Sequence, residues 1–201
     1  MRAARLAAIV LIGLGMLAYS AWLLEFVMPT GVSPVTEPVE DLLLGDALFR
    51  VTTGVAGLAF LAAGPPLMRL VPVHWTGRLT AVTVAAYGIL LLVDAGAPGS
   101  TLLRLLLNVA FLVGTVSLVL WWPPVWRTWA IGGLALILAT WALVLLGPQP
   151  WHGVFTRVQL AARAAEILVG GAYVVRMPLS KARKPPAPDG ILQCGGPPHP
   201  N

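Results

Sequence analysis

The sequence predicts an all-α, polytopic membrane protein with six transmembrane helices in one bundle. Hydrophobic residues make up 58% of the 201 residues and charged residues only 10%, whereas an ordinary soluble domain has about 25% charged residues. The mean hydropathy is +0.84. Because so few charged side chains cannot cover a water-facing surface, most of the exterior must face lipid.

Six apolar segments are long enough to cross a bilayer, because a helix needs about 20 residues to span about 30 Å of hydrocarbon. Each segment is apolar on every side, unlike a surface helix of a soluble protein. Prolines and glycines separate the segments, and proline ends helices because it fixes φ and lacks a backbone donor. The predicted spans are residues 6–27, 46–70, 79–93, 102–121, 126–146 and 158–175.

Two details refine these spans. Gly64-Pro65-Pro66 lies inside the second span, where we expect a kink or an early end of the helix. Small residues allow helices to approach closely, and we expect this at the pairs Gly13/Gly15, Gly54/Gly57, Gly132/Gly133 and Gly170/Gly171.

The first span has an alternative interpretation as a cleaved signal peptide. Two arginines precede an apolar run, and Ala18-Tyr19-Ser20-Ala21 provides small residues of the kind found at cleavage sites. The apolar run continues through Trp22-Leu23-Leu24, which favours a retained membrane anchor.

Basic residues predict the orientation, because they concentrate on the cytoplasmic side of membrane proteins. With both termini in the cytoplasm, the inner side has nine basic residues and the outer side four: Arg2, Arg5, Arg69, Arg78, Arg127, Arg176, Lys181, Arg183 and Lys184 against Arg50, Arg104, Arg157 and Arg163. Tryptophans are enriched at both interfaces, and we expect Trp75, Trp121, Trp122, Trp126 and Trp129 to form an inner belt. The predicted location is the plasma membrane.

Residues 177–201 differ from the apolar part in composition. Seven prolines and three glycines fall between Pro178 and Asn201. Such a segment buries too little apolar surface to offset its ordering entropy. We therefore predict a transmembrane domain over residues 1–176 and a disordered cytoplasmic tail over residues 177–201.

Several function classes are disfavoured. No basic patch with interleaved aromatic residues indicates nucleic-acid binding. The single cysteine, Cys194, excludes an intramolecular disulfide and a cysteine-based metal cluster. No catalytic motif is recognised, so we predict no cofactor and no catalytic residues.

The candidate site consists of polar residues close to the spans, because ionisable groups are costly inside a bilayer and mark functional positions. We expect them all in the outer third of the membrane. Asp46 and Arg50 are four residues apart and should lie on the same face of a helix. Gln159, Arg163 and Glu166 are spaced by four and three residues and should form a polar stripe on the sixth span. The candidate site residues are Arg50, Asp94, Arg104, Asn108, Arg157, Arg163 and Glu166.

If these faces converge, they form an outward-opening polar pocket under the acidic first loop. Arginines bind carboxylates and phosphates in bidentate geometry, which suits a lipid head group or a cell-envelope precursor. The alternative is a structural role, in which the arginines pair with Glu25, Asp94 and Glu166 or extend to the membrane surface.

Short motifs resemble a bacterial six-helix membrane family known as domain of unknown function 998. They are the acidic loop from Glu37 to Asp46 followed by Ala47-Leu48-Phe49-Arg50, the glycine-rich stretch Thr53-Gly54-Val55-Ala56-Gly57-Leu58, Leu92-Val93-Asp94-Ala95, and Gly153-Val154-Phe155-Thr156-Arg157. Family cysteines after that aspartate and a Ser-Glu-Leu in the first loop are absent here. The resemblance implies a fold and no established activity, and the composition is typical of a GC-rich, actinobacterial-type genome.

The sequence thus predicts a non-enzymatic envelope-associated or accessory protein that binds a lipid or a membrane-protein partner through its outer pocket. Membrane lipids are the first expected partners, and nucleic acid is not one. The alternative function is a small transporter or a lipid-modifying membrane enzyme that uses Asp94, Arg104, Arg163 and Glu166.

Overall fold

The computed structural model describes residues 2–177, and this part of the chain is helical without any strand. Within it, six helices are long and apolar enough to cross a membrane, which confirms the predicted fold class. Residues 178–201 of the tail that was predicted to be disordered lie outside the described residues. The long helices are α1 (Arg2–Tyr19, continued by the 3₁₀ helix Ser20–Phe26), α3 (Ala47–Leu70), α4 (Trp75–Gly96), α5 (Thr101–Trp121), α6 (Pro124–Leu146) and α7 (His152–Arg176).

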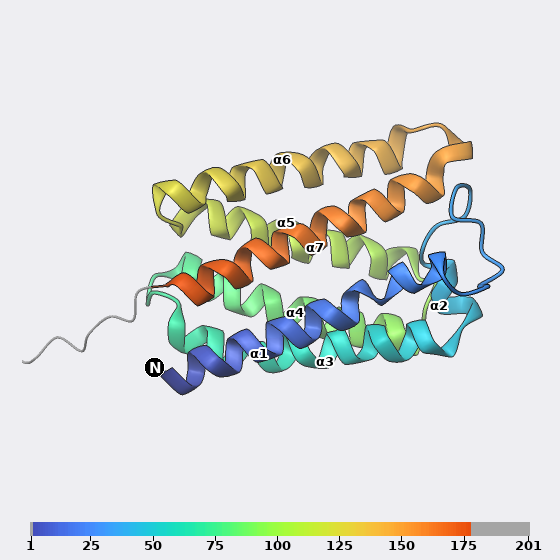
Figure 1. Ribbon diagram of the computed structural model, residues 1–201. Coiled ribbons are helices and arrows are strands. Elements are labelled where there is room, and N and C mark those ends of the chain that lie inside the picture. The colour runs from blue at the N-terminus through green and yellow to red at the C-terminus, as the bar shows by residue number, and fades with distance from the viewer. Residues whose placement is uncertain (1, 178–201) are drawn as a thin grey trace, which may run out of the picture.

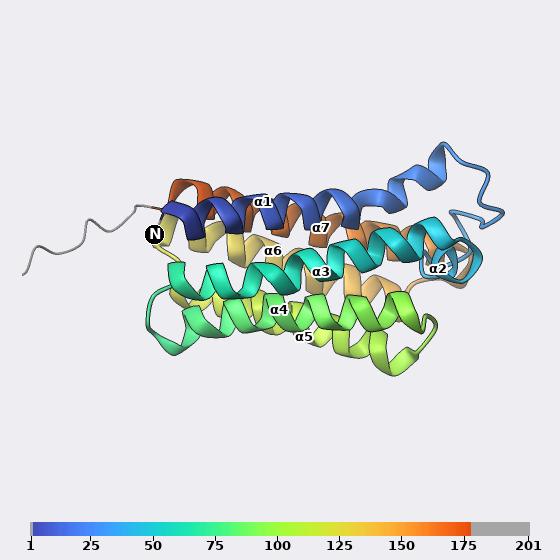
Figure 2. The same ribbon diagram turned by 90° about the horizontal axis from the view of Figure 1, so that it is seen from below.

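The long helices run antiparallel to their neighbours in one elongated bundle (Figure 1). Each contacts the next along the chain, and α7 also packs against α1, so that the helices enclose a common interior. Both ends of the described chain lie at one end of the bundle, which we call the terminus end. The long loop with the short helix α2 (Asp41–Gly45) lies at the other end, the loop end, and Figure 2 shows the same arrangement from below.

Several helices extend beyond the predicted spans. α4 begins at Trp75, before the expected residue 79, and α7 begins at His152, before residue 158. The prediction counted only the apolar run, whereas helical hydrogen bonding continues into the polar flanks. Pro124 opens α6 because a proline in the first turn has no bond to lose.

The early end expected at Gly64-Pro65-Pro66 is wrong, because α3 continues through both prolines to Leu70. Prolines are tolerated in a membrane helix when neighbouring helices support the segment. Gly64 packs directly on α4, since a Cβ atom there would lie 2.9 Å from the Cβ of Ala85. Tertiary packing therefore overrides the local helix-breaking tendency.

The closest helix contact joins α3 and α4 through Gly57 and Gly88. A Cβ on Gly57 would lie 2.8 Å from the carbonyl oxygen of Gly88, and one on Gly88 would lie 2.4 Å from the backbone nitrogen of Leu61. Gly57 was among the expected contact glycines, and Gly88 was not. The expectation is wrong for Gly13, Gly132 and Gly170, where an added Cβ would have nothing within 4 Å.

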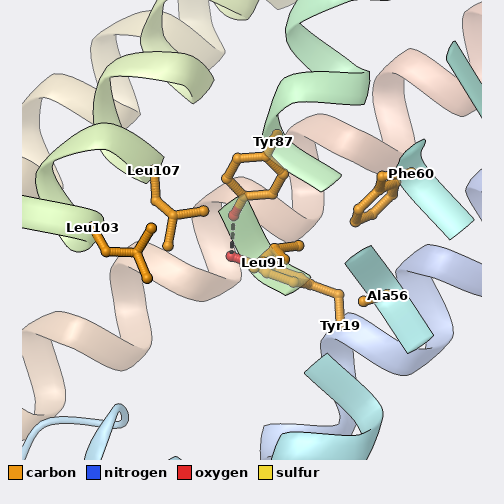
Figure 3. Close-up of a cluster of buried hydrophobic side chains, with 7 residues drawn as sticks. All are labelled: Tyr19, Ala56, Phe60, Tyr87, Leu91, Leu103 and Leu107. Carbon is orange, nitrogen blue, oxygen red and sulfur yellow. Dashed lines mark hydrogen bonds between the residues drawn. The ribbon is translucent and has the colours of Figure 1, made fainter. Parts of the chain in front are cut away.

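A cluster of buried side chains fills the middle of the bundle (Figure 3). Tyr19 from α1, Phe60 from α3 and Tyr87 from α4 meet there with ring centroids 6.2–6.4 Å apart. The Tyr87 hydroxyl donates a hydrogen bond to the Tyr19 hydroxyl at 3.1 Å, so each buried hydroxyl has a partner.

The predicted tryptophan belt is wrong for Trp122, which is buried. Its ring lies 4.8 Å from that of Tyr173, between centroids, inside a cluster that closes the terminus end. Trp75 and Trp129 at the same end are exposed, as an interfacial belt requires. Trp122 directly follows α5, where all neighbouring residues are apolar, so the sequence alone does not show whether its side chain faces the bundle interior or the membrane interface.

Candidate functional site at the loop end

Arg157 and Glu25 fasten two helices together at the loop end. The guanidinium of Arg157 on α7 donates from Nε and Nη2 to the two carboxylate oxygens of Glu25, each at 2.6 Å. Nη1 donates to the backbone carbonyls of Glu37 at 2.8 Å and Gly153 at 2.9 Å. Both side chains are buried, and each nitrogen of Arg157 has a partner, which is the arrangement that the structural alternative for the arginines expected.

The same part of α7 holds the long loop in place. A Cβ on Gly153 would lie 2.5 Å from the carbonyl oxygen of Glu37, so the loop backbone rests directly on the helix. The Thr156 hydroxyl accepts a hydrogen bond from the backbone nitrogen of Val39 at 3.3 Å. These contacts hold residues 37–39 over the bundle.

Arg50 and Asp46 do not pair, although they lie four residues apart. The Asp46 side chain accepts from the backbone nitrogen of Leu48 at 2.8 Å and caps α3. Arg50 donates to the carbonyls of Leu43 and Leu44, the latter at 2.9 Å, and so holds α2 against α3. Arg50 is exposed and does not line the cavity described next.

A cavity of about 90 Å³ opens under this loop. Val39, Glu40 and Leu42 line it from the loop and α2, and the other walls come from α1, α3, α4, α5 and α7. The polar side chains that line this loop-end cavity are Tyr19, Trp22, Glu40, Thr52, Thr53, Tyr87, Asp94, Arg104, Asn108, Gln159 and Arg163. Four of the seven predicted site residues therefore meet here: Asp94, Arg104, Asn108 and Arg163.

Asn108 connects α5 and α7 at the floor of this cavity. Its Oδ1 accepts from Gln159 Nε2 at 3.1 Å and from Arg163 Nη2, and its Nδ2 donates to the Arg104 carbonyl at 2.9 Å. The Arg163 guanidinium also lies 5.7 Å from the centre of the Phe111 ring, within cation–π range. Arg163 is 7% exposed, so this network is almost closed to solvent.

The charges in the cavity are not paired with one another. Among residues 2–177, the ion pair between Arg157 and Glu25 is the only one within 4.0 Å. Arg163 Nε and Arg104 Nε are buried without a hydrogen-bond partner in this part of the chain, and so are Glu40 Oε2 and the indole nitrogen of Trp22. Buried polar groups in native proteins are nearly always satisfied. These four unsatisfied atoms belong to side chains that line the cavity.

Glu166 does not belong to this cavity. Arg163 lies near the midpoint of α7, and Glu166 lies three residues further toward the terminus end, where it lines a second, apolar cavity. The expectation that all polar site residues occupy the outer third is therefore wrong for both residues. The predicted helix began where the apolar run begins, at residue 158, whereas α7 begins six residues earlier, at His152. Both residues therefore lie further from the start of the helix than the sequence indicated.

Sequence reasoning missed several cavity residues. Glu40 was noted only as part of an acidic loop, and Tyr19 and Tyr87 were not identified because they lie within apolar stretches. Their hydroxyls were the available signal, since a tyrosine at mid-span needs a hydrogen-bond partner.

Within residues 2–177, no group of three or more His, Cys, Asp or Glu side chains is placed to hold a metal ion. The fold and the six apolar helices define a multi-pass membrane protein. No family model, curated protein or solved structure matches the chain. The similarity to domain of unknown function 998 thus stays a prediction that rests on the short motifs given above.

Proposed function

We propose that this multi-pass membrane protein binds the head group of a membrane lipid in its loop-end cavity. In this proposal the protein is non-enzymatic and belongs to the envelope of a bacterial cell. The loop end faces the outside of the plasma membrane, and both termini lie in the cytoplasm.

The observation that carries the proposal is that Arg163 is buried beside the cavity without a carboxylate partner. This guanidinium is buried, lines the cavity, and has no carboxylate within 4.0 Å among the described residues. A buried charge without a counter-charge costs several kcal/mol. A phosphate or carboxylate in the cavity would reduce that cost, because the Arg163 side chain lines the cavity and can donate charge-assisted hydrogen bonds.

Two carboxylates narrow the class of head group. Asp94 and Glu40 line the same cavity as Arg104 and Arg163. A purely anionic ligand would be repelled by them, whereas a zwitterionic head group would place its phosphate near the arginines and its amine near the carboxylates. Phosphatidylethanolamine is the common membrane lipid with this charge pattern.

The charge distribution supports the orientation. The terminus end has the arginines at 2, 5, 69, 78, 127 and 176, and every described acidic residue except Glu166 lies in the loop-end half. An excess of basic residues favours the cytoplasmic side. The acidic loop end then faces outward.

Lipid binding is tested by native mass spectrometry of the purified protein with phosphatidylethanolamine, phosphatidylglycerol or inorganic phosphate. The wild-type protein is expected to retain phosphatidylethanolamine in preference to phosphatidylglycerol. Arg163→Gln is expected to weaken this binding at least tenfold, which is about 1.4 kcal/mol. Binding of inorganic phosphate alone would identify a free anion as the ligand instead.

Arg127→Gln is the matched control, because it removes the same charge from an exposed position at the terminus end. If Arg163→Gln does not fold, Arg104→Gln tests the same cavity from a partly exposed residue. A folded Arg163→Gln or Arg104→Gln protein that retains the lipid as the wild type does would refute the proposal.

A further inference from the structure

A second cavity, of about 130 Å³, occupies the terminus half of the bundle interior. Its walls come from α1, α3, α4, α5 and α7 and extend from Tyr87 near mid-bundle to Trp122 and Met177 at the terminus end. Aliphatic and aromatic side chains form most of the lining. We call it the inner cavity.

Among the described residues, Glu166 is the only charged one that lines the inner cavity. It is 8% exposed, and neither carboxylate oxygen has a hydrogen-bond partner in this part of the chain. The nearby Thr115 hydroxyl donates to the Phe111 carbonyl. Arg163, one turn away on α7, lines the loop-end cavity instead, and no basic side chain lies within 4.0 Å of Glu166 in residues 2–177.

The space around the carboxyl group depends on Gly133 of α6. A Cβ at Gly133 would lie 3.2 Å from the carboxyl carbon of Glu166, so the absence of a side chain there accommodates the glutamate. A carboxyl group at this depth in a membrane protein is costly and marks a functional position by default.

Aromatic rings form part of the cavity lining. Tyr87, Phe111, Trp121 and Tyr173 all line the cavity, and the rings of Trp121 and Tyr173 lie 5.5 Å apart between centroids. Aromatic faces attract ammonium groups within about 6 Å, most strongly where water is excluded. An apolar cavity with aromatic walls and one carboxylate therefore complements a cation with a hydrocarbon body.

We infer that the inner cavity binds a hydrophobic amine, with its ammonium group against the Glu166 carboxylate and its hydrocarbon body among the apolar and aromatic side chains. The amine supplies the counter-charge and the hydrogen-bond donors that Glu166 lacks. This site is separate from the head-group site, because Tyr87 alone of the described residues lines both cavities. Figure 3 shows the hydroxyl of Tyr87 bonded to that of Tyr19, which lines only the loop-end cavity.

The inference is tested with 1-aminoadamantane, a compact hydrocarbon cage that carries an ammonium group, and with 1-adamantanol as its uncharged counterpart. Binding to the purified full-length protein in detergent is measured by the change in tryptophan fluorescence, since Trp121 and Trp122 line the cavity. The wild-type protein is expected to bind the amine at least tenfold more tightly than the alcohol.

Two variants separate the role of the carboxylate from the role of the space. Glu166→Gln keeps the side-chain size and is expected to weaken amine binding at least tenfold while leaving alcohol binding unchanged. Ala110→Phe places a ring into the cavity and is expected to weaken binding of both compounds. Glu37→Gln, which removes a carboxylate from the exposed loop, is the control and is expected to bind as the wild type does.

Equal affinity of the wild-type protein for the amine and the alcohol would overturn the inference, and this comparison needs no variant. A folded Glu166→Gln protein with wild-type amine affinity would overturn it as well. Neither result bears on head-group binding, because Arg163 and its lipid are measured separately.

Discussion

Arginine and glutamate occur in the apolar bundle in two different states. Arg157 and Glu25 engage each other through two hydrogen bonds, and Arg157 uses its remaining donors on backbone carbonyls. Arg163 and Glu166 are equally buried, yet each faces a cavity without an opposite charge within 4.0 Å in residues 2–177. An unpaired buried charge is costly, and the two binding proposals rest on this second state, whereas Arg157 and Glu25 have the pairing expected of a structural bridge.

The structural role of the first pair gives a prediction about stability. Glu25→Gln leaves the buried Arg157 without a counter-charge and is expected to lower the free energy of unfolding by about 3–5 kcal/mol. The measurement is unfolding of the purified protein in mixed micelles with increasing denaturing detergent.

Glu37→Gln serves as the control for this experiment. Its exposed carboxylate accepts a hydrogen bond from the backbone nitrogen of Ser33 at 2.7 Å, and losing this bond is expected to cost less than about 1.5 kcal/mol. Equal stability of Glu25→Gln and the wild type would show that the ion pair does not hold the loop end together.

The sequence placed the relevant residue types near the spans but could not assign partners to them. Spacing paired Asp46 with Arg50, whereas Asp46 caps α3 and Arg50 bonds carbonyls of α2. Spacing also put Arg163 and Glu166 on one stripe, although their side chains line different cavities. Partners depend on how distant helices are rotated about their axes, and one sequence does not contain that information.

Among the helices, α3 and α4 form the tightest pair, through Gly57 and Gly88. An alanine at 88 would bring its Cβ to 2.4 Å from the backbone nitrogen of Leu61 and 2.6 Å from the Gly57 carbonyl oxygen. Both obstacles are backbone atoms, so neither can rotate away as a side chain would. The helices must separate to admit even one methyl group.

Gly88→Ala is therefore expected to destabilise the protein by about 1–3 kcal/mol, the usual cost of overpacking. Gly132→Ala is the matched control, because nothing lies within 4 Å of its Cβ position. Alanine favours a helix over glycine by up to about 1 kcal/mol, so the control is expected to be neutral or more stable. Thermal unfolding in detergent compares the two, and a Gly88→Ala protein as stable as Gly132→Ala would contradict the close packing.

At the level of helices, hydropathy and turn residues were sufficient to predict the six long elements. They missed the change to a 3₁₀ helix after Tyr19 and the short helix α2. The end of α3 at Leu70 agrees with the predicted span 46–70, whereas the early end expected at Pro65 and Pro66 does not occur. These features depend on contacts with other parts of the chain. Local sequence rules therefore gave the number of spans correctly and their ends only approximately.

Taken as a whole, the molecule is an antiparallel bundle whose two ends differ in charge and in the residues that cover the bundle interior. The terminus end has arginines and a cluster of aromatic side chains that includes Trp122 and Tyr173. The loop end has acidic residues and a loop fastened by Arg157 over a polar cavity. This asymmetry underlies the proposal that the cavity receives its ligand from outside the cell.

The most direct test of that claim is cysteine labelling from one side of the membrane. In a Cys194→Ser background, single cysteines are introduced at Val35 in the loop and at Val125 at the terminus end, both of which are exposed. A membrane-impermeant maleimide added to intact spheroplasts is expected to label Val35→Cys, and to label Val125→Cys only after permeabilisation. Labelling of Val125→Cys but not Val35→Cys in intact spheroplasts would place the cavity on the cytoplasmic side and contradict the account.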